Sequence, residues 1–237
     1  ESWARTRLDG TTSALLSASD YPQSNRKQAF TGPMKTSFGN RYGVSAASQG
    51  ATGAPFKGGL YFQGWKFGNE DFSRMLDYMM IINSATGEDV IGQFQNDITS
   101  IFHALKHSTL PGGLLLDPVG EWQYEGGAVS IRSLPARLAV ALGATTLGSA
   151  AYNFAWTEIP ESNKSVNGVS VPPLKEWEEF FFKRSKVLGN PAQFPLSYTG
   201  FAPNYPQGGV GNGALPYFLM RSSWDTNAVW ATASMGA

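Results

Sequence analysis

The stretch from Gly58 to Gly87, GGLYFQGWKFGNEDFSRMLDYMMIINSATG, constrains the fold of this chain more than any other. Its first half is a loop interrupted by glycines, and its second half carries apolar residues at the i, i+3, i+4, i+7 and i+8 spacing of one helix face. Asn69 is the expected N-cap and Gly87 the expected stop. We therefore expect an amphipathic helix with an aromatic loop at its N-terminal end. The apolar face comprises Phe72, Met75, Leu76, Met79 and Met80.

The loop before this helix combines aromatic and hydrogen-bonding side chains, namely Tyr61, Phe62, Gln63, Trp65, Lys66 and Phe67. Aromatic faces pack against the C–H surface of a pyranose ring, and a phenol donates or accepts a proton. The loop therefore favours sugar binding. The alternative is that its aromatic rings cover the end of the helix.

Composition narrows the function classes. The chain has 237 residues with 18 basic and 18 acidic side chains, and neither sign forms the basic stripe of a nucleic-acid binder. There is no cysteine, which excludes disulfides and thiolate metal sites. No apolar run approaches the roughly 20 residues of a membrane span. Low charge with abundant aromatic residues is typical of carbohydrate-active proteins that are secreted or periplasmic.

Three further helices are predicted, at Asp89–His107, Ser133–Ser149 and Lys175–Leu188. Their apolar stripes read Ile91, Phe94, Ile98, Ile101, Phe102 and Leu105 in the first; Leu134, Leu138, Ala141, Leu142 and Thr145 in the second; Trp177, Phe180, Phe181 and Leu188 in the third.

His103 and His107, the only histidines, are spaced i, i+4 on the predicted helix. A metal-binding pair is one interpretation. Both residues fall on the side of the helical wheel away from the apolar stripe, and no glutamate completes a metalloprotease pattern. The sequence therefore favours a solvated helix face, and no metal ligand is predicted in this chain.

Two other segments contribute candidate site residues. Leu110–Gly127 is a glycine-bounded loop with Asp117, Glu121, Trp122 and Tyr124. Asp20–Gly68 has little periodicity, and a loop of that length is uncommon unless it is functional. We expect it to wrap over the site with Asn40 and Arg41.

The character of the chain changes after Pro191. Pro216–Trp224 and Ala228–Ser234 read as two strands around a turn at residues 225–227. A lone hairpin is marginal in water, so the rest of its sheet is expected from a second chain or from a missing C-terminal segment. We predict a mainly α fold: an incomplete α/α toroid of helical hairpins at 1–190, and a linker with the β-hairpin that begins an antiparallel β-sandwich at 191–237.

Three stretches resemble the heparinase II/III-like polysaccharide lyases. GGLYFQGWKFG resembles the tyrosine-bearing loop that enters a toroid helix. LPGGLLLDPVGE resembles a later loop with an acidic residue, and LPYFLMRSSWDTNAVWATASMGA resembles the opening strands of the sheet domain.

The resemblance implies β-elimination at a uronic acid within an acidic polysaccharide. Tyr61 is the implied catalytic base or acid, and Asn40 or Arg41 the group that neutralises the uronate carboxylate. Gln63, Trp65, Glu121, Trp122 and Tyr124 are the implied substrate contacts. No cofactor is expected in this chain; a structural zinc or calcium ion belongs to the missing part of the sheet domain.

This chain departs from the lyase family's pattern at two points, so alternative functions stay open. If the family tyrosine corresponds to Phe67, the chain lacks that phenol, and the histidines of the family's sheet domain are absent. A non-catalytic carbohydrate-binding or structural subunit is therefore one alternative. A toroid glycoside hydrolase that uses a carboxylate pair such as Asp117 and Glu121 is the other.

Overall fold

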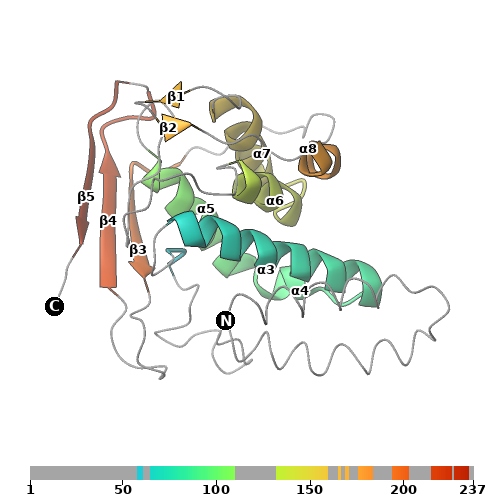
Figure 1. Cartoon of the computed structure of the whole chain (residues 1–237). Coiled ribbons are helices and arrows are strands. Elements are labelled where there is room, and N and C mark those ends of the chain that lie inside the picture. The colour runs from blue at the N-terminus through green and yellow to red at the C-terminus, as the bar shows by residue number, and fades with distance from the viewer. Residues whose placement is uncertain are drawn as a thin grey trace.

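The computed structural model describes residues 58–60, 65–109, 132–159, 165–166, 169–170, 176–183, 194–202, 215–225 and 227–234. This part of the chain is mainly helical and ends in a small antiparallel sheet, as predicted (Figure 1). The elements are α3 (Trp65–Thr86), α4 (Val90–Gln93), α5 (Gln95–Ser108), α6 (Ser133–Ala141), α7 (Thr146–Asn153), the π-helix η1 (Phe154–Glu158), β1 (Ser165–Val166), β2 (Val169–Ser170), α8 (Glu176–Phe182), β3 (Ser197–Ala202), β4 (Leu215–Arg221) and β5 (Trp230–Ser234).

Helix α3 confirms the predicted apolar stripe. Phe72, Met75, Leu76 and Met79 are buried, and Met80 packs against them. Gly87 has a φ of +71° and its N–H donates to the Asn83 carbonyl at 3.0 Å, so it ends the helix as predicted.

The predicted start of α3 was wrong. The helix begins at Trp65, and Asn69 lies inside it. The Asn69 side-chain oxygen instead accepts a hydrogen bond from the Leu134 N–H of α6 at 3.2 Å. Burial of Trp65 in the core explains the earlier start, because packing of an apolar residue outweighs a capping preference.

Two predicted single helices are each broken into two. Asp89 caps the short α4 by accepting from the Gly92 N–H at 2.8 Å, and α5 restarts after Phe94. Between α6 and α7, Gly143 adopts a φ of +64° and Thr145 caps α7 through the Gly148 N–H at 3.0 Å. Thr145 is therefore exposed instead of inward-facing, because it serves as a cap.

In helix α8, the two phenylalanines predicted to lie on the apolar stripe are exposed, and the third is buried. Phe180 and Phe181 are 81% and 63% exposed, whereas Phe182 is 7% exposed and packs beneath α6. Successive residues point about 100° apart around a helix, so only one of three consecutive phenylalanines faces the core. The sequence alone does not say which.

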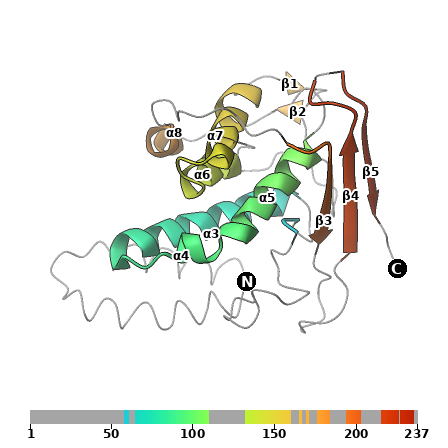
Figure 2. The same ribbon diagram turned by 180° about the vertical axis from the view of Figure 1, so that it is seen from behind.

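The C-terminal sheet has three strands in the order β3-β4-β5, all antiparallel. Tyr198 of β3 lies opposite Leu219 of β4, and Leu219 opposite Thr232 of β5. Strand β3 falls in the segment that was predicted to be a linker, so part of the hairpin's missing sheet comes from the chain itself. Figures 1 and 2 both show the sheet at one end of α5, and β3 and β4 contact that helix.

None of the helices in the described ranges has the length and apolar character of a membrane span.

Candidate functional site

Among the described residues, ionisable and aromatic side chains gather where the last two turns of α5 meet β3 and β4; we call this region the α5–sheet junction. His107 is 1% exposed there, and His103 is half-buried. The Tyr198 ring stacks on both imidazoles, with centroid distances of 5.7 Å to His103 and 5.3 Å to His107. Phe194 and Trp224 contact the His107 ring edge-on at 6.3 and 5.1 Å.

The predicted solvated histidine face is therefore wrong. The helical wheel placed both residues correctly opposite the main stripe, but the sheet covers that side of α5 as well. A helix with partners on two sides buries residues of two stripes, and the second partner lies almost ninety residues further along the chain.

Hydrogen bonds fix the rings. The His107 Nδ1 atom lies 2.8 Å from the His103 carbonyl oxygen, and its Nε2 atom lies 2.9 Å from the Pro195 carbonyl oxygen. The Tyr198 hydroxyl donates toward the carbonyls of Ser100 and Gly58, at 3.2 and 3.3 Å. Two indole N–H groups donate to backbone carbonyls of the cluster: that of Trp224 to the Phe194 carbonyl, and that of Trp230 to the His107 carbonyl.

Burial lowers the pKa of both histidines below the usual 6.5, and for His103 the neighbouring His107 lowers it further. Both ring nitrogens of His107 face carbonyl oxygens, so this ring is not placed to ligate a metal. In the described ranges, no three His, Asp or Glu side chains gather into a group suited to a metal ion.

Charged side chains border the histidines. Lys106 pairs with Glu158, and its Nζ atom lies 5.1 Å from the centre of the Trp224 ring. The Arg221 guanidinium lies over the same ring at 4.1 Å and donates to the Thr109 carbonyl at 3.1 Å. Burial lowers the pKa of Lys106, while Glu158 opposes that shift. The junction thus holds two basic side chains, one carboxylate, a phenol and two imidazoles.

The residues just before Tyr61, Gly58 to Leu60, lie next to this cluster. Gly59 has a φ of +72°, and a Cβ atom there would lie 2.1 Å from the Ser100 carbonyl oxygen, so only glycine fits. Leu60, directly before the loop, is 0% exposed, and Trp65, directly after it, is 4% exposed. The two residues that flank segment 61–64 are therefore both held in the core.

Of the predicted site residues, only Trp65 lies among the described residues. Its ring contacts Phe72 edge-on at 6.3 Å and belongs to the core, so in this structure it presents almost no surface to a ligand. The others lie outside the described residues: Asn40, Arg41, Tyr61, Gln63, Asp117, Glu121, Trp122 and Tyr124.

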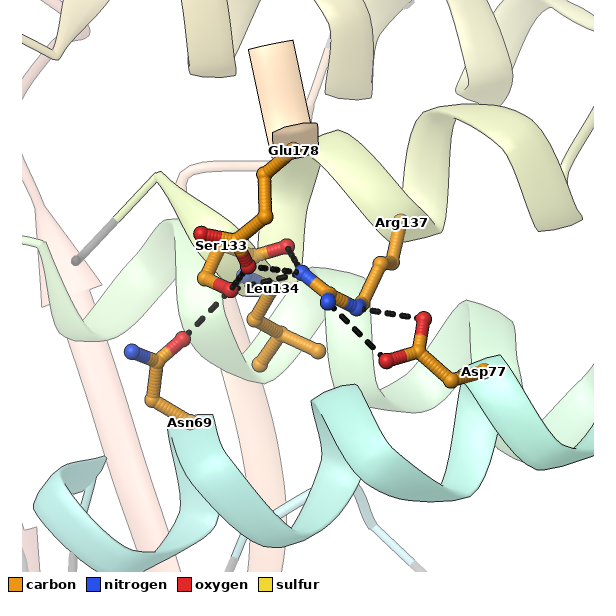
Figure 3. Close-up of polar contacts among 6 residues, drawn as sticks. All are labelled: Asn69, Asp77, Ser133, Leu134, Arg137 and Glu178. Atoms are coloured by element: carbon orange, nitrogen blue, oxygen red, sulfur yellow. Dashed lines mark hydrogen bonds and ion pairs between the residues drawn. The ribbon is translucent and has the colours of Figure 1, made fainter. Parts of the chain in front are cut away.

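A second polar cluster joins α3, α6 and α8; we call it the Arg137 junction (Figure 3). The Arg137 Nε and Nη2 atoms donate to the two carboxylate oxygens of Asp77 at 2.7 and 2.9 Å. Its Nη1 atom donates to Glu178 at 2.7 Å and to the Ser133 hydroxyl at 2.6 Å. Arg137 is 3% exposed and its guanidinium lies over the Phe182 ring at 4.6 Å. This geometry ties three helices together.

Burial raises the pKa of Asp77 despite the opposing hydrogen bonds from Arg137, and the nearby Glu178 carboxylate adds to the rise. Asp77 is the most exposed member of the cluster at 32%, so its carboxyl group is the one within reach of solvent.

Sequence reasoning missed Tyr198, Lys106, Arg221 and Trp224. The i, i+4 histidine pair was the available signal for the site, but its partners come from the sheet. Only the three-dimensional arrangement brings these residues together.

Comparison with known proteins found no matching family model, no similar curated protein and no similar solved structure.

Proposed function

We propose that this chain is part of a polysaccharide lyase that cleaves a uronate-containing polymer by β-elimination. In this proposal, residues 1–190 belong to an incomplete α/α toroid, and residues 191–237 open an antiparallel β-sandwich. The protein acts on an acidic polysaccharide outside the cytoplasm, and a second chain or further segment completes the sheet domain.

The observation that carries the proposal is that the described residues on either side of segment 61–64 are fixed in the core. A catalytic phenol must be held within hydrogen-bond reach of the proton it moves, and small displacements cost rate. Leu60 and Trp65, which flank residues 61–64, are buried in the core, and Gly59 packs so closely against the Ser100 carbonyl of α5 that a side chain would not fit there.

The residues implied by the family resemblance cover the steps of the reaction. Elimination requires neutralisation of the uronate carboxylate, removal of the C5 proton, and protonation of the leaving oxygen. Tyr61 serves the proton transfers, and Asn40 or Arg41 neutralises the carboxylate. Gln63, Glu121, Trp122 and Tyr124 contact the sugar, while Trp65 supports the loop from the core.

The direct test incubates the natively purified protein with a panel of uronate polymers. Cleavage is measured by the ultraviolet absorbance of the unsaturated uronate that β-elimination produces. Tyr61→Phe removes only the phenolic oxygen and is expected to lower kcat by about 10²–10⁴-fold. Tyr152→Phe, a half-buried tyrosine on α7, is the matched control and is expected to retain activity.

Three results discriminate the candidates. Unsaturated ends that depend on Tyr61 support the lyase. Binding of a polymer without cleavage supports the non-catalytic subunit instead, and saturated products support a hydrolase with Asp117 and Glu121. Equal activity of Tyr61→Phe and the unmodified protein contradicts the role given to Tyr61.

A further inference from the structure

The turn at Gly58–Leu60, directly before Tyr61, lies on α5 in close backbone contact. Gly58 and Gly59 have φ values of +82° and +72°, which glycine adopts without strain. A Cβ atom on Gly59 would lie 2.1 Å from the Ser100 carbonyl oxygen, so the backbone of the turn packs directly against the backbone of the helix. Leu60 then enters the core with 0% exposure.

A side chain of the sheet meets the same place on α5. The Tyr198 hydroxyl of β3 lies 3.2 Å from the Ser100 carbonyl oxygen and 3.3 Å from the Gly58 carbonyl oxygen. A phenol has one proton to donate, so the two carbonyls share it, and the hydroxyl bridges the turn and the helix. Tyr198 lies 140 residues after Gly58 in the chain. The bridge is therefore a product of the tertiary fold.

The ring and backbone of Tyr198 are fixed by their neighbours. The ring stacks on His103 and His107, and the residue pairs with Leu219 in the register of β3 and β4. Stacking and strand pairing already restrict this side chain, so forming the bridge costs little further side-chain entropy. The hydroxyl is thus held in position at the Ser100 carbonyl.

We propose that Tyr198 is a positioning residue of the proposed lyase: its hydroxyl holds the Gly58–Leu60 turn on α5 and so sets where the chain enters Tyr61. This inference rests on the proposed function. Tyr61 is bonded to Leu60, so its Cα lies about 3.8 Å from that of Leu60, and a shift of the turn is passed to its backbone. A group that transfers a proton must stay within hydrogen-bond reach of it, and a displacement of about 1 Å lowers a rate by as much as about 10²-fold.

Tyr198→Phe is the direct test, because it keeps the stacked ring and removes only the oxygen that bridges Gly58 and Ser100. On a uronate polymer that the unmodified protein cleaves, the kcat of the variant is expected to fall by about 10–100-fold. KM is expected to change by less than about twofold, because the groups that bind the sugar are untouched. The loss of one hydrogen bond is expected to lower the melting temperature by only about 2–4 °C.

Phe182→Ala separates positioning from a general loss of stability. Phe182 is 7% exposed on α8, which lies away from the sheet in Figures 1 and 2. Its truncation leaves a cavity and is expected to lower the melting temperature more than Tyr198→Phe does. Assayed well below both melting temperatures, Phe182→Ala is expected to keep kcat within about twofold of that of the unmodified protein. An equal fall of kcat in the two variants, or full activity of Tyr198→Phe, would overturn the positioning role.

A pair of glycine variants tests the turn itself. Gly59→Ala places a Cβ atom against the Ser100 carbonyl, whereas Gly87→Ala, at the end of α3, has a nearly equal φ of +71° and nothing within 4 Å of the added atom. Both variants carry similar backbone strain, but only Gly59→Ala displaces the turn from α5. We expect kcat to fall in Gly59→Ala alone. Equal kcat values in the two variants would contradict the placement of the turn as the cause.

Carbonyl carbon chemical shifts of Gly58 and Ser100 test the bridge without any measurement of activity. Both shifts are expected to change in Tyr198→Phe and to stay unchanged in Tyr152→Phe, a tyrosine of α7. Unchanged shifts in Tyr198→Phe would overturn the bridge even if the protein is a lyase. If the unmodified protein cleaves no uronate polymer, the proposed lyase fails, and the same shifts still decide whether Tyr198 holds the turn.

Discussion

The Arg137 junction and the α5–sheet junction each hold separate elements together, but they do so with different interactions. The first joins three helices through a guanidinium that faces two carboxylates. The second joins a helix to a sheet through stacked rings, with two histidines whose pKa values are lowered by burial. Charge pairing makes the Arg137 junction intolerant of losing one partner, whereas ring packing makes the α5–sheet junction sensitive to added charge.

The largest expected effect comes from removing the guanidinium. Arg137→Met leaves the Asp77 and Glu178 carboxylates without their shared donor and should lower the free energy of unfolding by about 3–5 kcal/mol. Chemical denaturation measures it. Arg74→Met is the matched control, because the Arg74–Glu70 pair on α3 is more than a third exposed on both sides, and it should cost less than about 1 kcal/mol. Equal losses in the two variants would refute the difference between buried and exposed pairs.

The next largest change in stability is expected from the phenylalanines of α8. Phe182→Ala empties a site beneath the Arg137 guanidinium and should cost about 3 kcal/mol. Phe180→Ala removes an 81% exposed ring of the same helix and should change stability by no more than about 0.5 kcal/mol. Thermal or urea unfolding of both variants checks the ratio; a larger loss for Phe180 would mean that its exposed ring contacts another surface in the native protein.

In the α5–sheet junction, Trp224 has the central place that Arg137 has in the other cluster, because it contacts several of the other members. Trp224→Leu removes the ring that contacts His107 and Arg221, and also the N–H donated to Phe194. We expect a loss of about 2 kcal/mol, smaller than for Arg137, because Lys106 keeps its ion pair with Glu158 and Arg221 keeps its hydrogen bond to the Thr109 carbonyl. Val229→Ala, on the exposed turn before β5, is the control with little effect. Urea unfolding of the two variants gives the comparison, and a Trp224 loss above that of Arg137→Met would invert the ranking.

The smallest expected effect is a difference in pH response. The raised pKa of Asp77 means that its carboxyl group adds stability in acid, present below pH 3.8 and lost as the pH rises through the folded-state pKa. The histidines act in the opposite direction, since their stabilisation is lost as the pH falls below 6.5. Asp77→Asn should therefore flatten the acidic limb of a stability–pH curve and leave the limb near pH 6.5 unchanged. A change confined to the limb near pH 6.5 would contradict this assignment.

The contrast also explains how far the sequence could predict the fold. The stripes of α3 and α5 follow a helical period, so their inner faces were predictable from the order of residues. The break at Gly143 and the choice among Phe180, Phe181 and Phe182 depend on neighbours distant in sequence. Strand β3 was missed because Ser197–Ala202 alternates weakly and gains its place by pairing with β4.

The candidate site shows the same limit. The spacing of His103 and His107 was visible, but a single helical stripe could not reveal that the other side of α5 is also buried. Tyr198 and Trp224 join the histidines only through the path of the sheet. The anchoring of Leu60 and Trp65 likewise depends on the core that surrounds them.

The most direct test of the proposed lyase is the fate of water during cleavage. The natively purified protein is incubated with uronate polymers in water enriched in heavy oxygen, and the new chain ends are weighed by mass spectrometry. β-Elimination predicts unsaturated ends that carry no heavy oxygen, because the bond breaks without addition of water. Saturated ends that carry heavy oxygen would contradict the lyase and indicate hydrolysis.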